Sequence, residues 1–237
     1  MISVLVVTKD EENRYLHSVL THLRLSGYTN VLVYDDRSKD RTRAIARDCG
    51  ADVIVRSSHV KSFRENESEF RQASWRAASY IVDPYDWLLV LDADEYIMTQ
   101  QHVLMNDLSG LAKSSVNVNF HEAWALNRIR VDGYWKGNKI PRLVRYREDA
   151  DFKPKSMGCQ PVPKKAYEDP ADWPHVEILH VGYMDPDDRQ TKFEFYSKLP
   201  SHGHNPSHIN SIIGHYKLKS TEEVGLSEWP GVYRGEG

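Results

Sequence analysis

Residues 87–95 read Trp-Leu-Leu-Val-Leu-Asp-Ala-Asp-Glu, an uninterrupted apolar run followed by a cluster of acidic residues. A continuously apolar run of this length is typical of a strand that is covered on both faces, as in a parallel sheet. The acidic residues then follow the carboxyl end of that strand, which is where open parallel sheets bind their ligands. The stretch therefore predicts both a buried strand and a candidate site.

The chain on the N-terminal side repeats the same alternation of short apolar runs and helical periodicity. Predicted strands cover residues 2–7, 31–34, 52–55 and 87–91, and predicted helices cover residues 13–26, 38–48 and 67–80. Ser38 is the expected cap of the second helix. Strands separated by helices predict right-handed crossovers and an α/β fold with a mostly parallel central sheet.

After residue 100 the pattern is less regular. It predicts helices over residues 101–111 and 189–199, and strands over residues 116–120, 140–146 and 176–181. We expect a single domain over residues 1–219, with residues 1–100 and 101–219 as its two halves, and a C-terminal tail over residues 220–237.

Composition limits the class of protein. The net charge of −3 gives no global electrostatic case for nucleic-acid binding. The two cysteines, Cys49 and Cys159, are too few for a disulfide framework and fit a reducing compartment. No apolar run approaches the roughly 20 residues that span a bilayer. These features predict a soluble, cytoplasmic protein without a transmembrane segment.

Polar side chains follow three of the predicted strands. Thr8 follows the first strand, Asp35 and Asp36 follow the second, and Asp92 and Asp94 follow the fourth. The chain contains neither G-x-G-x-x-G after the first strand nor G-x-x-x-x-G-K-[ST], the two glycine motifs whose backbone cradles phosphates. Without such a cradle, carboxylates can hold phosphates through a divalent cation, because hard cations take oxygen ligands.

The spacing of Asp92 and Asp94 puts both carboxylates on the same side of an extended backbone. One can bind a cation while the other holds a ribose hydroxyl or a metal-bound water. The same D-x-D spacing recurs in residues 149–151 and 185–187, but neither of these pairs directly follows an apolar run. We interpret those two pairs as solvated loop charges.

Residues 34–42, Tyr-Asp-Asp-Arg-Ser-Lys-Asp-Arg-Thr, are similar to the "DDxSxDxT" signature of family 2 glycosyltransferases of the GT-A fold. The Thr8 region and residues 91–95 resemble further motifs of that family, in the same order. The resemblance covers the first hundred residues. It implies a GT-A (Rossmann-like) sheet flanked by helices, with a less regular C-terminal acceptor-side region. It also implies metal-dependent, inverting transfer of a sugar from a nucleotide-diphosphate donor, with a UDP-sugar favoured.

The resemblance assigns roles to residues at matching positions. Thr8 and Asp35, with Asp36 beside it, match contacts to the nucleobase, and Arg71 matches a basic residue near the nucleotide or diphosphate. The alternatives are that Asp35 or Asp36 caps the next helix and that Arg71 is a surface charge. Asp92 matches the ribose contact.

Other implied roles concern the diphosphate and the metal. Ala93 lies between the ribose contact and Asp94, which matches the ligand for Mn²⁺ or Mg²⁺ and thereby takes part in catalysis. In the fainter resemblance after residue 100, His180 is a candidate second metal ligand, with a structural histidine as the alternative. Lys192 or Arg142 is a candidate to neutralise the leaving diphosphate.

The catalytic base is the least defined role. The family resemblance implies a carboxylate that accepts the proton of the acceptor hydroxyl. Asp132 and Glu177 are the candidates. Related proteins have a His-Glu pair after the Arg-Leu strand, but the corresponding stretch here reads Gly158-Cys159-Gln160-Pro161, so the resemblance does not identify the base. The acceptor stays open between a carbohydrate, a protein side chain and a modified nucleobase, and oligomeric state is not readable.

Two other classes of function compete with a glycosyltransferase. A sugar-phosphate nucleotidyltransferase also uses such a sheet and a divalent ion, but the first strand is not followed by a glycine-rich, basic loop for a triphosphate. A non-catalytic sugar- or nucleotide-binding module would retain the same fold.

Overall fold

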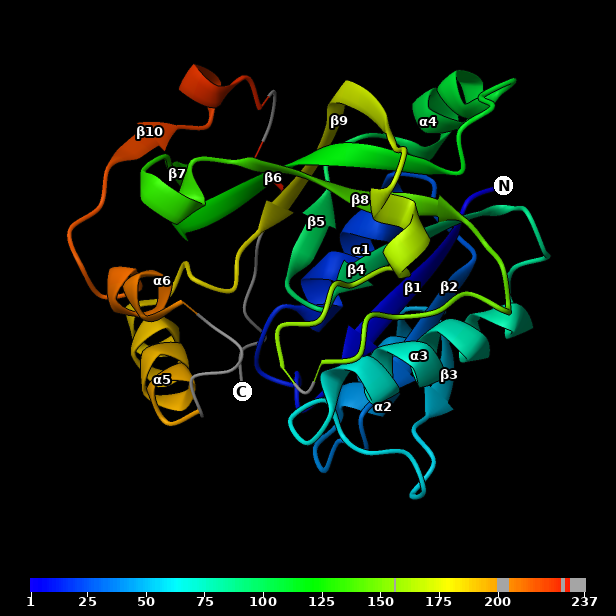
Figure 1. The fold of residues 1–237 in the computed structure, drawn as a ribbon, viewed down its shortest axis with the longest axis horizontal. Helices are drawn as coiled ribbons and strands as arrows, with labels where there is room; N and C mark the ends of the chain where they lie inside the picture. The colour runs from blue at the N-terminus through cyan, green and yellow to red at the C-terminus, as the bar shows by residue number, and fades with distance from the viewer. Residues whose placement is uncertain (156, 200–204, 227–228, 231–237) are drawn as a thin grey trace.

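The computed structural model describes residues 1–155, 157–199, 205–226 and 229–230. These residues form a curved ten-stranded sheet with helices on both faces (Figure 1). The strands are β1 (Ser3–Thr8), β2 (Val31–Asp35), β3 (Asp52–Val55), β4 (Trp87–Asp92), β5 (Glu95–Ile97), β6 (Ser115–Ala125), β7 (Arg128–Arg130), β8 (Asn138–Arg145), β9 (Ala171–His180) and β10 (Leu218–Ser220). The α-helices are α1 (Leu16–Leu25), α2 (Thr42–Asp48), α3 (Glu67–Ala77), α4 (Gln101–Leu108), α5 (Pro186–Ser197) and α6 (Pro206–Ser211). Short 3-10 helices are η1 (Ala78–Tyr80), η2 (Gly133–Trp135), η3 (Lys164–Tyr167) and η4 (Glu222–Val224).

β1 lies at the centre of the N-terminal half of the sheet. It pairs in parallel with β2 on one side and β4 on the other, so that Val6 lies opposite both Val33 and Leu91. All six β1 residues are buried because both faces of the sheet are covered, which explains the continuous apolar run. β3 pairs in parallel with β2 at the edge. The order β3-β2-β1-β4 therefore brings the carboxyl ends of all four strands to one edge.

The C-terminal half extends the sheet mainly with antiparallel strands. β8 joins β4, and β6, β7 and β10 follow across the sheet. β9 lies between β5 and β6, antiparallel to the first and parallel to the second. This pairing places His180 between Glu95 and Glu122. The predicted α/β class, with helices flanking a central sheet, is confirmed.

The sheet divides the core in two. One face is covered by α1, α2 and α4, where Leu16 and Leu104 are fully buried. The other face is covered by α3, through Phe70 and Trp75. Alternate residues of β2 pack into the cores on the two faces, because successive side chains of a strand point to opposite sides. This alternation decides which of the acidic residues after β2 faces α3.

The second helix begins at Thr42 and not at Ser38, so the predicted cap at Ser38 is wrong. Ser38 Oγ instead accepts the backbone N–H of Asp10 at 2.9 Å. Asp40 Oδ1 accepts the backbone N–H of Thr42 at 3.0 Å, at the start of the helix. The bond to Asp10 ties the loops after β1 and β2 together, a long-range contact that local spacing does not predict.

The C-terminal part of the described chain is packed against the sheet. Ser220 of β10 pairs with Arg128 of β7, and Leu226 is buried. The predicted boundary after residue 219 therefore falls within a paired strand, while residues 227–228 and 231–237 of the predicted tail lie outside the described residues. None of the helices that the structure describes has the length and apolarity to cross a bilayer.

Candidate active site

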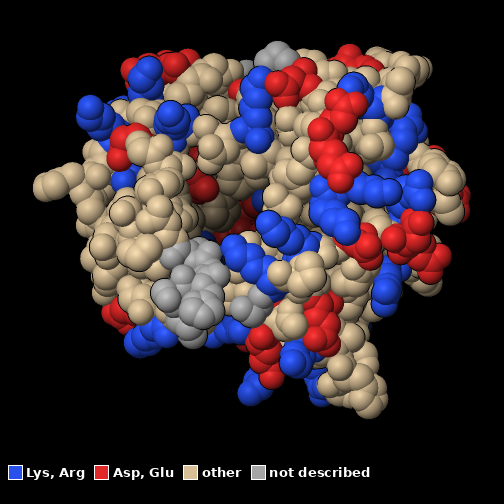
Figure 2. All heavy atoms as spheres, viewed as in Figure 1, with Lys and Arg blue, Asp and Glu red and all other residues tan. Residues whose placement is uncertain are grey.

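The carboxyl ends of β1, β2 and β4 and one face of α5 line a cavity of about 400 Å³. Residues 7–11, Arg14, Asp36 and residues 92–94 form the sheet side of it. Helix α5 contributes residues at the spacing of one helix face: Asp188, Thr191, Lys192 and Phe195. Figure 2 shows a hollow near the centre of this face of the molecule, with acidic side chains at its bottom and basic side chains beside it. The structure thus brings together strand ends and a C-terminal helix.

Asp94 lies where the two halves of the chain meet. Its Oδ2 is 3.3 Å from His180 Nε2 and 3.6 Å from Lys192 Nζ. Burial alone would raise the pKa of Asp94, but the positive charges of His180 and Lys192 outweigh burial and hold that pKa well below its usual range. Asp94 is therefore ionised, and the three predicted residues are in contact.

His180 has a carboxylate on each side of its ring. Nδ1 lies 2.6 Å from Glu122 Oε2, and Nε2 faces Asp94. Burial would lower the pKa of His180, but Glu122 and then Asp94 outweigh it and raise the pKa to about 10. The rings of Phe120 and Tyr183 lie 5.7 Å and 5.4 Å from the imidazole. Two carboxylates and two aromatic rings thus hold the orientation of the imidazole.

Gly182 makes the convergence of these side chains possible. A Cβ built on Gly182 would overlap Asp94 Oδ2 and Lys192 Nζ, and would lie 2.7 Å from His180 Nε2. The space beside this glycine is therefore a cradle bounded by a carboxylate oxygen, an imidazole nitrogen and an ammonium group. A carboxylate oxygen such as Asp94 Oδ2 is a ligand that suits Mn²⁺ and Mg²⁺, and an imidazole nitrogen can bind a transition-metal ion beside it. Within the described chain, His, Cys, Asp and Glu side chains do not form a group of three or more that would hold a metal ion.

Asp92 is fixed by a buried arginine. Arg71 Nη1 and Nη2 donate to the two oxygens of Asp92 at 2.7 Å and 3.2 Å, which is a bidentate pair. Arg71 is only 3 % exposed, lies over the ring of Phe63 and also faces Glu67. Burial would raise the pKa of Asp92, but Arg71 outweighs it and lowers that pKa. The alternative interpretation of Arg71 as a surface charge is wrong, because Arg71 is buried and positions Asp92.

The acidic pair at the carboxyl end of β2 is split between two environments. Asp36 lines the cavity, accepts the backbone N–H of Phe63 at 3.1 Å and pairs with Arg56 and with Lys9. Asp35 is fully buried, and its Oδ2 accepts the backbone N–H of Ser38 at 3.0 Å. Asp36 therefore faces the cavity, whereas Asp35 stabilises the loop. Side chains alternate along the strand, so Asp36 points to the face that α3 covers, whereas Asp35 points to the opposite face.

Thr8 and Ala93 both line the cavity, close to the strand ends. Thr8 Oγ1 is buried and has no hydrogen-bond partner within the described chain. The backbone carbonyl of Thr8 accepts the N–H of Asp36 at 2.9 Å, which continues the β1–β2 pairing into the loop. The predicted donor residues Thr8, Asp36, Asp92, Ala93 and Lys192 are thus gathered around one cavity.

Residues 3–104 match the family described as "Glycosyl transferase family 2". This segment is therefore similar to family 2 glycosyltransferases. The match confirms the resemblance that residues 34–42 and 91–95 carry, and with it the GT-A fold class. The family 2 segment holds Asp94 but ends before His180 and Lys192.

Two solved structures are similar to part of the chain. One, described as a mycobacterial protein, is 23% identical with a TM-score of 0.40, over 52% of this chain and 41% of that chain. The other is glucosyl-3-phosphoglycerate synthase from Mycobacterium tuberculosis in complex with Mn²⁺, UDP and glucosyl-3-phosphoglycerate, 23% identical with a TM-score of 0.39, over 51% and 44%. The match therefore spans less than half the length of these proteins. No curated protein matches the chain.

Cationic side chains that the sequence did not single out also line this cavity. Arg14 Nη1 donates to Asp188 of α5 at 2.8 Å, and Arg64 lies over the ring of Phe195. Burial raises the pKa of Glu11, which faces Arg14, to about 7. These residues join the β1 loop and the loop before α3 to α5, so only the tertiary fold reveals them.

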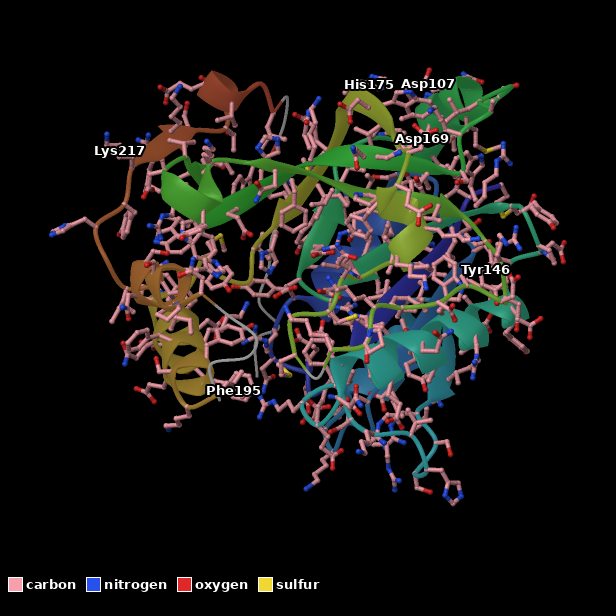
Figure 3. The ribbon with its side chains drawn as sticks, in the orientation of Figure 1. Asp107, Tyr146, Asp169, His175, Phe195 and Lys217 are labelled. Carbon is pink, nitrogen blue, oxygen red and sulfur yellow. The ribbon has the colours of Figure 1, made fainter. Side chains whose placement is uncertain are left out.

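Asp132, predicted as the catalytic base, lies outside this cavity. Its carboxylate accepts from Arg130 Nε at 2.9 Å and Nη2 at 3.1 Å, and from the backbone N–H of Lys217 at 2.9 Å. Figure 3 shows Lys217, whose backbone N–H donates to Asp132, beside β10, whereas Phe195, which lines the cavity, lies on α5. The hydrogen bonds from Arg130 lower the pKa of Asp132, which disfavours proton acceptance. In the described structure Asp132 holds Arg130 over the ring of Trp124, away from the residues that line the cavity.

We expect Asp132→Asn to lower stability without changing ligand binding. A hydrogen bond to a charged group contributes roughly 1.5–3 kcal/mol, so urea unfolding should show a loss of about that size. Calorimetric affinity for UDP with Mn²⁺ should stay within twofold of the wild type. A large loss of affinity at unchanged stability would return Asp132 to the active site.

Glu177, the other candidate base, also does not line the cavity. Its Oε1 lies 3.3 Å from His121 Nε2, between β9 and β6. Because strand neighbours alternate in direction, His121 and Glu177 lie on the opposite face of these strands from Glu122 and His180.

Proposed function

We propose that this chain transfers a sugar from a nucleotide-diphosphate sugar, with a UDP-sugar favoured, to an acceptor hydroxyl. The observation that carries the proposal is the convergence of Asp94, His180 and Lys192 beside Gly182, at the edge of a family 2 segment. Asp94 and His180 would hold Mn²⁺ or Mg²⁺, and diphosphate oxygens and water would complete its coordination. When bound, the cation neutralises negative charge on the departing nucleoside diphosphate.

The chain's own side chains divide the remaining tasks. Asp36 lies at the end of the cavity that the β2 loop forms and would accept hydrogen bonds from the nucleobase, beside Thr8. Asp92, held in one orientation by Arg71, would accept from a ribose hydroxyl. Lys192 is close enough to Asp94 to share the diphosphate with the metal and to stabilise its charge as the bond breaks.

Inversion at the anomeric carbon is part of the proposal. It requires a carboxylate that accepts the proton of the acceptor hydroxyl. A carbohydrate, a protein side chain and a modified nucleobase each offer such a hydroxyl. Asp132 and Glu177 are not proposed for the role, because both are paired with cations or histidine away from the cavity.

The experiment that tests the function is a thermal-shift panel of UDP, GDP, dTDP, their sugars, and the triphosphates with a sugar phosphate, each with Mn²⁺ and with EDTA. One nucleotide at a hundred times its Kd should stabilise the protein by about 2.7 kcal/mol, and only with metal. Slow release of the nucleoside diphosphate from the matching donor should accompany binding. Stabilisation by a triphosphate together with a sugar phosphate would favour a nucleotidyltransferase instead. Binding without any donor breakdown would favour a non-catalytic module.

A further inference from the structure

The neighbours of His180 on the two adjacent strands are both glutamates, but they are not equivalent. Glu95 of β5 and Glu122 of β6 are the residues paired with His180 in the sheet. Glu95 is committed elsewhere: its Oε1 pairs with Arg142, and its Oε2 accepts the backbone N–H of Asp92 at 2.9 Å. Glu122 is the one whose carboxylate reaches the imidazole, at 2.6 Å from Nδ1.

We infer that Glu122 is a positioning residue that acts through His180, an inference that rests on the proposed function. A neutral imidazole carries one N–H, and a nitrogen that binds a metal must be the other, unprotonated one. By accepting the hydrogen bond from Nδ1–H, Glu122 keeps a proton on Nδ1 and leaves Nε2 as the nitrogen that would bind the cation. Nε2 is also the nitrogen that faces Asp94 and the space beside Gly182.

The described groups around the imidazole offer Nδ1–H no second acceptor that could replace Glu122. The rings of Phe120 and Tyr183 lie beside the imidazole and confine it. Among the contacts that the structure describes for Nδ1, Glu122 is the hydrogen-bond acceptor. A carboxylate behind a metal-binding histidine also raises the basicity of the ligand. Loss of such a partner typically lowers metal affinity by about 10- to 100-fold.

A matched control lies on the same two strands. Glu177 of β9 and His121 of β6 form a second carboxylate–histidine pair, at 3.3 Å, on the opposite face of the strands. The side chains of Glu122 and Glu177 are similarly shielded, at 17 % and 18 % exposed. Glu177→Met therefore reproduces the loss of a shielded charge without touching His180.

The test compares Glu122→Met, Glu122→Gln and Glu177→Met by Mn²⁺ binding, measured by electron paramagnetic resonance in the presence of UDP. Glu122→Met should weaken Mn²⁺ binding by about 10- to 100-fold. Glu122→Gln should lose distinctly less, because its amide oxygen can still accept from Nδ1–H. Glu177→Met should match the wild type, and UDP binding in EDTA should be equal in all four proteins.

The outcomes separate this inference from the proposed function. If the wild type fails to bind Mn²⁺ with UDP, the proposed UDP-dependent metal site is wrong. If the wild type binds but Glu122→Met binds equally well, the positioning role is wrong. The role is also wrong if Glu177→Met loses as much affinity as Glu122→Met, since the effect is then a general loss of structure.

Discussion

Replacing Gly182 by alanine is expected to remove metal-dependent nucleotide binding while leaving the protein folded. The added Cβ would overlap Asp94 Oδ2 and Lys192 Nζ and approach His180 Nε2 to 2.7 Å. These are the ends of side chains, so they would move apart to admit the methyl group. Gly182 is not among the residues with positive φ, so alanine suits its backbone and the fold should tolerate the change.

The expected size of this effect is large because the displaced atoms are the proposed metal ligands. We expect Kd for UDP with Mn²⁺ to rise at least about 100-fold, which corresponds to roughly 2.7 kcal/mol. Isothermal titration of the variant with UDP, with Mn²⁺ and with EDTA, measures it. The metal-free affinity should change much less than the metal-dependent one.

Gly214→Ala is the matched control. Gly214 also lacks a positive φ, and a Cβ there would lie 3.3 Å from the backbone oxygen of Asn210, a tight contact outside the cavity. It should perturb stability without changing the metal dependence of UDP binding. Wild-type affinity in Gly182→Ala would contradict the proposed metal site, because that cradle would then be dispensable.

The strand-end part of the site is predictable from local sequence. Apolar runs reveal β1, β2 and β4, and parallel strands leave their carboxyl ends at one edge, so Thr8, Asp36 and Asp94 had to lie close together. What the runs do not reveal is the direction of each side chain in the following loop. Asp35 is therefore buried in the loop, although it is adjacent to Asp36 in the sequence.

The parts that escaped prediction depend on contacts between distant segments. Glu122 meets His180 because β6 and β9 pair in register across 58 residues of sequence. Gly182 matters only because α5 brings Lys192 back to Asp94. The three-residue strands β5, β7 and β10 were missed for the same reason: such short segments carry no periodicity, and their partners define them.

Replacing Asp94 by asparagine is expected to cause the largest loss of activity. Asparagine keeps the size of the side chain but removes the charge that faces both His180 and Lys192. The rate of donor breakdown should fall by about 10³-fold, or roughly 4 kcal/mol in the barrier, if the carboxylate binds the catalytic metal. Mn²⁺ binding in the presence of UDP should weaken in parallel.

The same substitution should change stability in a pH-dependent way in metal-free protein. The folded pKa of Asp94 is depressed, so its carboxylate stabilises the fold above its unfolded pKa and that contribution is lost as pH falls through the folded value. Asp94→Asn should therefore be less stable than the wild type at pH 7 in EDTA, and the difference should shrink below about pH 4.

The control for Asp94 comes from another D-x-D pair of the chain. Asp149 is 71 % exposed and pairs with Arg147 at 2.9 Å, away from the cavity, so Asp149→Asn should leave donor breakdown, Mn²⁺ affinity and stability unchanged. Urea unfolding at two pH values and a coupled assay for released nucleoside diphosphate measure all three. If Asp94→Asn behaved like Asp149→Asn, Asp94 would be one more solvated charge. The apolar run before it would then indicate only a strand. The D-x-D spacing of Asp92 and Asp94 indicates a metal site only because Asp94 faces His180, Lys192 and the space beside Gly182.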